Sequence, residues 1–256
     1  MTRTAVLFLL LNLWITCLAL QCTEVPGRLK QIDAGNGQVF GVCPKGDIFT
    51  LYGSSFIRLQ GLLKHVSVGP AGVWGVNSTN QIHKLVKGDW VPVPGMLKQV
   101  DAGGKMFVAG VNPGGLVFCL GAEATTKYAG PGSPASWTQL PGKLKYYSCG
   151  PHSCWGVNVE EQVFLMKGVT PTACAGSLEW QQIPGALSMI EVSTDGKVYG
   201  LDSEGDVHQR EGVAPCNLAG TGWRKINLSQ KVRHVSYDLG YLWLVGRDNH
   251  ITYCTE

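Results

Sequence analysis

Charge of either sign is scarce in this chain and is not concentrated anywhere. Charged residues make up 15% of the 256 residues, and 21 Lys and Arg against 18 Asp and Glu leave a net charge of +3. Because the cations are scattered rather than gathered in a stripe, the electrostatic footprint of nucleic-acid binding is missing. After the first 20 residues, no apolar run approaches the length that crosses a bilayer. The sequence therefore predicts no nucleic-acid partner and no membrane span.

The short motifs of common catalytic sites are missing too. The chain has no Gly-x-Ser-x-Gly, no His-Glu-x-x-His, no Gly-rich phosphate loop and no Cys/His metal spacing, and its six histidines are dispersed. We therefore expect no enzymatic activity, no catalytic residue and no required cofactor, and we assign no metal ligand.

No stretch has the period of an amphipathic helix, and a long repeat is present instead. The phrase Leu-Lys-x-Ile/Val-Asp/Ser-x-Gly, or a weaker form of it, begins at Leu29, Leu63, Leu97, Leu144, Leu187 and Val232. These starts lie 34, 34, 47, 43 and 45 residues apart, a range typical of stacked supersecondary units. Later in each copy an aromatic residue is usually followed by Gly-Val-Asn, and most copies close with Trp-x-x-aliphatic-Pro-Gly.

Each copy contains four short stretches rich in Val, Ile, Leu and aromatics, separated by Gly, Pro and Asn. This pattern predicts four antiparallel strands per copy, and six such copies predict an all-β, six-bladed β-propeller. Residues 22–27 match the closing element that the last copy lacks. The N-terminal strand is therefore expected to complete the sixth blade, so that residues 21–256 form a single domain.

The N-terminus predicts export, and the cysteines agree with that prediction. Residues 1–20 have the basic, apolar and small-residue order of a secretory signal peptide, so the protein is expected to be extracellular. Removal of the signal peptide leaves eight cysteines, an even number suited to an oxidising compartment. Ring closure places Cys22 beside Cys254. A tight turn separates Cys149 from Cys154, which are close enough to pair. Cys119 and Cys174 could form a bridge between neighbouring blades. Cys43 and Cys216 have no assigned partner, and Asn77 and Asn227 stand in N-glycosylation sequons.

Two positions of the repeat are candidates for ligand binding. Hydrogen-bond acceptors recur near the end of the first strand, as in Asp33, Ser67 and Asp101, and aromatics recur early in the second strand, as in Trp74 and Trp155. An acceptor beside an indole suits a sugar, because the C–H face of the sugar stacks on the ring while its hydroxyls donate to the acceptor.

A second candidate set follows the second strand at a turn and comprises Asn112, Asn158 and Asp202. A pocket built from these residues would lie on the opposite face of the ring. Each set also has a purely structural interpretation. The tryptophans could pack in the core, and the turn residues could hydrogen-bond their own backbone.

The combination of motifs resembles tectonin repeats, and residues 22–256 with the preceding signal resemble the fish egg lectin family. The resemblance implies a six-bladed tectonin propeller, secreted into egg or body fluid. It also implies binding of N-acetylglucosamine and of microbial glycans such as lipopolysaccharide or peptidoglycan in innate defence. The degenerate fifth and sixth copies imply fewer than six equivalent sugar sites. The alternative is a secreted propeller that binds other proteins without sugar recognition. Participation of calcium, held by scattered acidic residues, and formation of a homodimer stay open.

Overall fold

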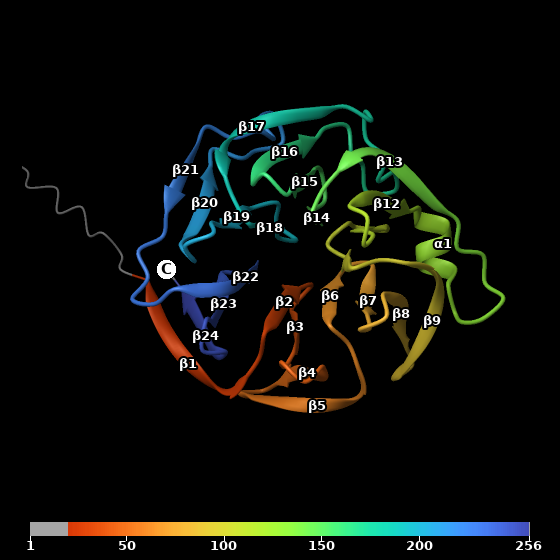
Figure 1. The fold of residues 1–256 in the computed structure, drawn as a ribbon, viewed down its shortest axis with the longest axis horizontal. Coiled ribbons are helices and arrows are strands. Elements are labelled where there is room, and N and C mark those ends of the chain that lie inside the picture. The colour runs from red at the N-terminus through yellow and green to blue at the C-terminus, as the bar shows by residue number, and fades with distance from the viewer. Residues whose placement is uncertain (1–19, 256) are drawn as a thin grey trace, which may run out of the picture.

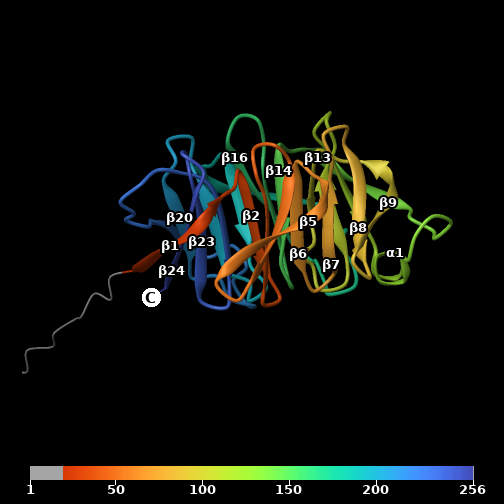
Figure 2. The same cartoon turned by 90° about the horizontal axis from the view of Figure 1, so that it is seen from below.

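The computed structural model describes residues 20–255, which form six four-stranded antiparallel sheets. Figure 1 shows these sheets arranged radially around a central axis, and Figure 2 shows their strands running between the two faces of the ring. Each sheet is one blade, so the predicted six-bladed β-propeller is confirmed. Residues 1–19 of the expected signal peptide lie outside the described residues. Within residues 20–255, no helix is long and apolar enough to cross a membrane.

Five blades each consist of four consecutive strands, with the first strand innermost. The first blade contains β2 (Gln31–Gly35), β3 (Gln38–Val42), β4 (Asp47–Tyr52) and β5 (Ser55–Leu62). The second contains β6 (His65–Gly69), β7 (Gly72–Val76), β8 (Gln81–Val86) and β9 (Asp89–Met96). The third contains β10 (Gln99–Asp101), β11 (Val108–Val111), β12 (Leu116–Leu120) and β13 (Trp137–Lys143). The fourth contains β14 (Tyr146–Cys149), β15 (Cys154–Val157), β16 (Gln162–Met166) and β17 (Trp180–Ala186). The fifth contains β18 (Met189–Val192), β19 (Val198–Leu201), β20 (Val207–Glu211) and β21 (Gly222–Lys225).

The sixth blade joins the two ends of the chain. It contains β22 (Val232–Asp238), β23 (Tyr241–Gly246) and β24 (His250–Thr255), and its outer strand is β1 (Gln21–Arg28) from the N-terminus. In Figure 1, β1 (red) lies along β24 (dark blue) at the rim of the ring. Their register pairs Cys22 with Cys254, and a disulfide joins these two residues. The N-terminal closure predicted from the sequence is therefore present.

The repeat motif follows from how each blade packs. The glycine in the middle of the second strand leaves space for the leucine that precedes the first strand. A Cβ added at Gly75 would lie 2.3 Å from a methyl carbon of Leu63. At the rim, the indole of Trp137 donates a hydrogen bond to the carbonyl of Pro94 in the preceding blade, at 2.8 Å. The conserved spacing of Leu, Gly, Trp and Pro within each copy therefore records contacts inside and between blades.

The two faces of the ring differ in their connections. On the face that we call the turn face, the second strand of each blade turns into the third. On the opposite face, called the loop face, the third strand connects to the fourth, and three of these connections are long insertions: 121–136, 167–179 and 212–221. The first insertion contains a short helix, α1 (Ala122–Lys127), which the sequence analysis did not predict because it found no helical period there. Disulfides join Cys119 to Cys174 in the second insertion and Cys149 to Cys154 across a turn, as expected, whereas Cys43 and Cys216 are free.

Candidate functional site

The acceptors at the end of the first strand hold neighbouring blades together. Their side chains are 0–6% exposed. In five blades an acceptor oxygen receives a backbone N–H from the next blade, from its innermost strand or from the residue that directly follows that strand. The donor–acceptor pairs are Val68 to Asp33 (2.6 Å), Ala102 to Ser67 (2.8 Å), Cys149 to Asp101 (2.9 Å), Val192 to Ser148 (2.9 Å) and Ala34 to Ser236 (2.9 Å). In the fifth blade, Glu191 accepts from the hydroxyl of Ser236 at 3.2 Å, which completes the circle. The assignment of Asp33, Ser67 and Asp101 to sugar binding is corrected here, because their oxygens are buried and already bonded.

Burial changes the ionisation of the carboxyls in this circle. Asp33, Asp101 and Glu191 come from the first, third and fifth blades, and serines occupy the same position in the blades between them. Burial, followed by repulsion from Asp33, raises the pKa of Asp101 to about 8. Burial also raises the pKa of Asp33 and Glu191. Asp101 is therefore protonated at neutral pH, which reduces the charge buried at the centre of the ring.

The raised pKa of Asp101 predicts a pH-dependent stability. The unfolded carboxyl ionises near pH 4, whereas the folded one stays protonated up to about pH 8, so stability is lost as pH rises through that window. Asp101→Asn should flatten the fall in unfolding free energy between pH 7 and 8 by up to about 1.4 kcal/mol per pH unit. Chemical denaturation at a series of pH values measures the slope, with Asp89→Asn on the exposed rim as the control. An unchanged slope for Asp101→Asn would contradict the assignment.

Trp74 and Trp155 are both fully buried, so neither offers a ring face to a sugar. Insertions on the loop face contribute to this burial. Lys84 lies 5.4 Å from the centre of the Trp74 ring and donates to the carbonyls of Thr125 and Tyr128 in the first insertion. Trp155 belongs to a buried core cluster against which Val213 and Leu218 of the third insertion pack. The prediction that these two tryptophans contact sugar is therefore wrong, and their role is packing.

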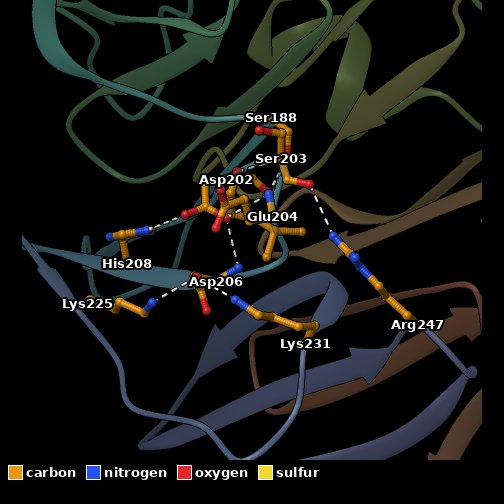
Figure 3. A network of polar contacts seen from close by, with 10 residues as sticks. Ser188, Asp202, Ser203, Glu204, Asp206, His208, Lys225, Lys231 and Arg247 are labelled. Carbon is orange, nitrogen blue, oxygen red and sulfur yellow. Dashed lines mark hydrogen bonds and ion pairs between the residues drawn. The ribbon is translucent and has the colours of Figure 1, made fainter.

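The turn residues hydrogen-bond their own backbone but stay partly accessible. The Oδ1 atoms of Asn112, Asn158 and Asp202 accept from the N–H four residues later, at 2.8 Å in each case. Figure 3 shows Asp202 also contacting His208, at 2.9 Å. Nearby, hydrogen bonds from Lys225 and Lys231 lower the pKa of Asp206 to about 2. Of the predicted turn residues, Asn112 also lines a cavity of about 280 Å³, together with Met96, Phe118 and Trp137.

The aromatic at this repeat position lines an open cleft in the sixth blade, where it is Trp243. The cleft lies between the sixth and first blades on the loop face and has a volume of about 580 Å³. The connection between β4 and β5 in the next blade is only Gly53 and Ser54, whereas insertions stand at this place in the third to fifth blades. Trp243 itself is 5% exposed, and the accessible ring is that of Tyr241, which is 45% exposed. The sequence analysis did not predict this cleft, because the second blade has an equally short connection and the pattern therefore does not single out the sixth and first blades.

Polar groups border the aromatic wall of the cleft. Tyr241 and Tyr253 meet edge to face with their ring centres 5.6 Å apart. Glu24 and Thr23 come from β1, Gln38 from β3 and Ser55 from β5, and all four line the cleft. Asp238 lies at its inner end, where it accepts from the backbone N–H of Gly37 at 2.8 Å and contacts the hydroxyl of Thr194. The arrangement combines an exposed ring with hydrogen-bonding side chains from the first blade and from the N-terminal strand of the sixth blade.

Comparison with known proteins decides the family. The model of the Tectonin domain matches residues 28–247, most of the chain. The chain belongs to the tectonin family. This tectonin protein is 56% identical over 236 residues to a protein of Cyprinus carpio named fish-egg lectin, covering 92% of this chain and 98% of the carp protein.

Solved structures share the fold of this tectonin protein at low sequence identity. Human WBSCR16 superposes with a TM-score of 0.57 at 13% identity, covering 88% of this chain and 71% of its own. Virginiamycin B lyase from Staphylococcus aureus superposes with a TM-score of 0.56 at 10% identity, covering 86% and 78%. At these identities the likeness concerns the ring of blades alone.

The two predicted glycosylation acceptors of the tectonin protein differ in their surroundings. The amide of Asn77 is bonded within its turn, donating to Gln81 at 2.8 Å and accepting from the hydroxyl of Thr79 at 2.9 Å. Asn227 is exposed, between β21 and β22. Glycosylation at either residue stays a prediction.

Proposed function

We propose that this protein is a secreted, non-enzymatic lectin that binds N-acetylglucosamine in the cleft between its sixth and first blades. The observation that carries the proposal is the open cleft lined by Tyr241, Trp243 and Tyr253 in a chain closely related to a lectin. The volume of about 580 Å³ lies within the range of small-molecule sites, about 300–1,000 Å³. A pyranose ring can lay its C–H face on Tyr241 while its hydroxyl and acetamido groups reach Glu24, Gln38 and Ser55.

The natural ligands that we propose are microbial glycans containing N-acetylglucosamine, such as peptidoglycan or lipopolysaccharide, recognised in egg fluid as part of innate defence. A single shallow sugar site binds weakly, so a repeating glycan would be held by several sites acting together. The cavity beside Asn112 is a second candidate site on the turn face, and a homodimer would double the number of clefts. We propose that calcium is not required, so that a chelator should leave the affinity for the free sugar unchanged.

Titration of monomeric N-acetylglucosamine against two tyrosine variants tests the cleft. Tyr241→Ala should weaken binding by about tenfold or more, since it removes the accessible ring, and about 1.4 kcal/mol corresponds to tenfold. Tyr52→Ala is the matched control, because Tyr52 is 76% exposed on the neighbouring β4 and does not line the cleft. Both variants should keep the melting temperature of the unsubstituted protein.

Other outcomes of this titration assign the sugar elsewhere. Loss of binding in Asn112→Ala or Asn158→Ala, with Tyr241→Ala unaffected, would place the sugar on the turn face. A folded protein that binds nothing on a glycan array, but captures a defined protein partner, would replace the lectin proposal with the scaffold alternative.

A further inference from the structure

We propose that the turn-face end of the propeller axis binds phosphate monoesters and pyrophosphate through five cationic side chains, Lys30, Lys64, Lys98, Lys145 and Arg233. We call this set the cation crescent. It lies on the face opposite the aromatic cleft, and the inference does not depend on sugar binding.

The crescent arises from one position of the repeat. Each lysine immediately precedes the innermost strand of its blade, and Arg233 is the second residue of β22. The five blades involved are consecutive around the ring: the sixth, first, second, third and fourth. The four lysines share one backbone anchor, since each donates its N–H to the last residue of the second strand, at 2.7–2.8 Å. In the fifth blade the equivalent residue is Ser188, which leaves the crescent open on one side. Because innermost strands of neighbouring blades are in direct contact, the fold forces these cations together.

The cations of the crescent affect one another electrostatically. Partial burial lowers the pKa of Lys64, and repulsion from Lys30 and Lys98 lowers it further. The pKa of Lys98 is lowered by burial and by Lys145, and Arg233 contributes to the lowering at Lys30. Mutual repulsion of these like charges destabilises the ligand-free protein, and a bound dianion would offset that repulsion.

Few protein anions neutralise the crescent. Among residues 20–255, Lys30, Lys64 and Lys98 enter no ion pair, and Lys145 is 3.6 Å from a carboxylate oxygen of Glu161. Lys64 instead contacts the neutral side-chain oxygen of Asn80. Asp206, on the turn of the fifth blade, is already bonded to Lys225 and Lys231, at 2.8 and 2.7 Å (Figure 3).

The layer of side chains next to the crescent is polar and uncharged. Tyr146 bonds through its hydroxyl to Nε2 of both His65 and His234, at 3.0 and 3.1 Å. Burial is the main cause that lowers the pKa of His65 to about 3, and repulsion from Lys64 and Lys30 lowers it further. Burial also lowers the pKa of His234. Both imidazoles are therefore neutral at physiological pH, and the Nδ1 atom of each is buried with no hydrogen-bond partner in the described chain. These neutral side chains therefore supply no negative charge to the crescent.

Calorimetric titration with inorganic pyrophosphate at low ionic strength tests the crescent. The unsubstituted protein should bind saturably, and Lys64→Gln, which removes the central cation, should weaken binding by about tenfold or more, since it removes one charge-assisted hydrogen bond. The matched control is Lys167→Gln, which removes the same charge from an exposed loop-face residue that enters no ion pair among the described residues. Absence of saturable binding, or equal losses in both variants, overturns the proposal.

Two further arms identify the source of the phosphate and exclude unfolding. Glucosamine 6-phosphate should bind Lys64→Gln more weakly than the unsubstituted protein and should bind Tyr241→Ala with unchanged affinity. Weaker binding to Tyr241→Ala with unchanged binding to Lys64→Gln would mean that the phosphorylated sugar binds only in the aromatic cleft. That result would overturn the crescent as its site. Unphosphorylated N-acetylglucosamine should bind Lys64→Gln normally, so failure of the lectin proposal is seen separately. In the absence of ligand, Lys64→Gln should melt at the same or a higher temperature at low ionic strength, because it relieves repulsion. A lower melting temperature would show that Lys64 is a structural residue and would overturn its role as a ligand.

Discussion

Removing β1 should unfold the ring at temperatures where the complete protein is stable. Residues 21–28 pair with β24 from Gln21 opposite Thr255 to Arg28 opposite His250, and they bury Val25 in the core shared by the sixth and first blades. Their loss exposes the edge of β24 and deletes the Cys22–Cys254 disulfide, whose ends are 232 residues apart. In the chain-entropy model, a disulfide that closes a loop of this length stabilises the folded protein by about 5 kcal/mol.

The expected fall in melting temperature is about 10 °C or more, since each kcal/mol corresponds to about 2–4 °C for a domain of this size. Sugar binding should be lost as well, because Thr23, Glu24 and Val25 form one wall of the cleft. The double variant Cys22→Ser/Cys254→Ser separates the two contributions, since it keeps the strand and removes the covalent bond. A truncated chain that melts at the temperature of the complete protein would show that β1 does not close the ring.

Gly69→Ala should have the second largest effect on stability. Gly69 ends β6 at the point where the innermost strands of the second and third blades touch, and an added Cβ would lie 2.2 Å from the carbonyl oxygen of Ala102. That separation is far below van der Waals contact, and neither backbone can move without breaking the hydrogen bond from Ala102 to Ser67. We expect a loss of about 3 kcal/mol or more, at the upper end of the range for overpacked cores.

Denaturant unfolding of Gly69→Ala beside Gly121→Ala measures this effect. Gly121 has φ −67° and no atom within 4 Å of an added Cβ, so its substitution should change stability little. If the two variants unfold at the same denaturant concentration, the close contact between innermost strands is not the reason for glycine at this place in the repeat.

The fold could be predicted from the sequence because the information that specifies it is local and repeated. Each strand is encoded by its own residues, and the turn residues between strands recur at fixed places in each copy. Closure was predictable because residues 22–27 match the closing element of the other copies, and β1 indeed pairs with β24. The short helix α1 was not predicted, since six residues inside an insertion are too few to establish a helical period.

The candidate site was harder to predict because the same residue types serve contacts between blades. Asp33 and Asp101 have the spacing of a binding motif, yet they receive backbone N–H groups from the next blade, some 35–48 residues away. Trp74 and Trp243 occupy one repeat position, but only Trp243 lines an open cleft. Lys84 beside the Trp74 ring donates to the carbonyls of Thr125 and Tyr128 in the insertion of the following blade, whereas the blade that follows Trp243 has only a two-residue turn at that place.

The sequence by itself determined the number of blades, the strand that closes the ring and the three cysteine pairs, because strand propensity, turn chemistry and spacing act over short distances or repeat along the chain. Only the tertiary structure decided which recurring polar and aromatic side chains face solvent, because burial depends on neighbouring blades that are remote in sequence. Packing six innermost strands around one axis buried Asp33, Ser67 and Asp101 as links between blades. The same packing brought five scattered cations together on one face and left one aromatic cleft open on the other.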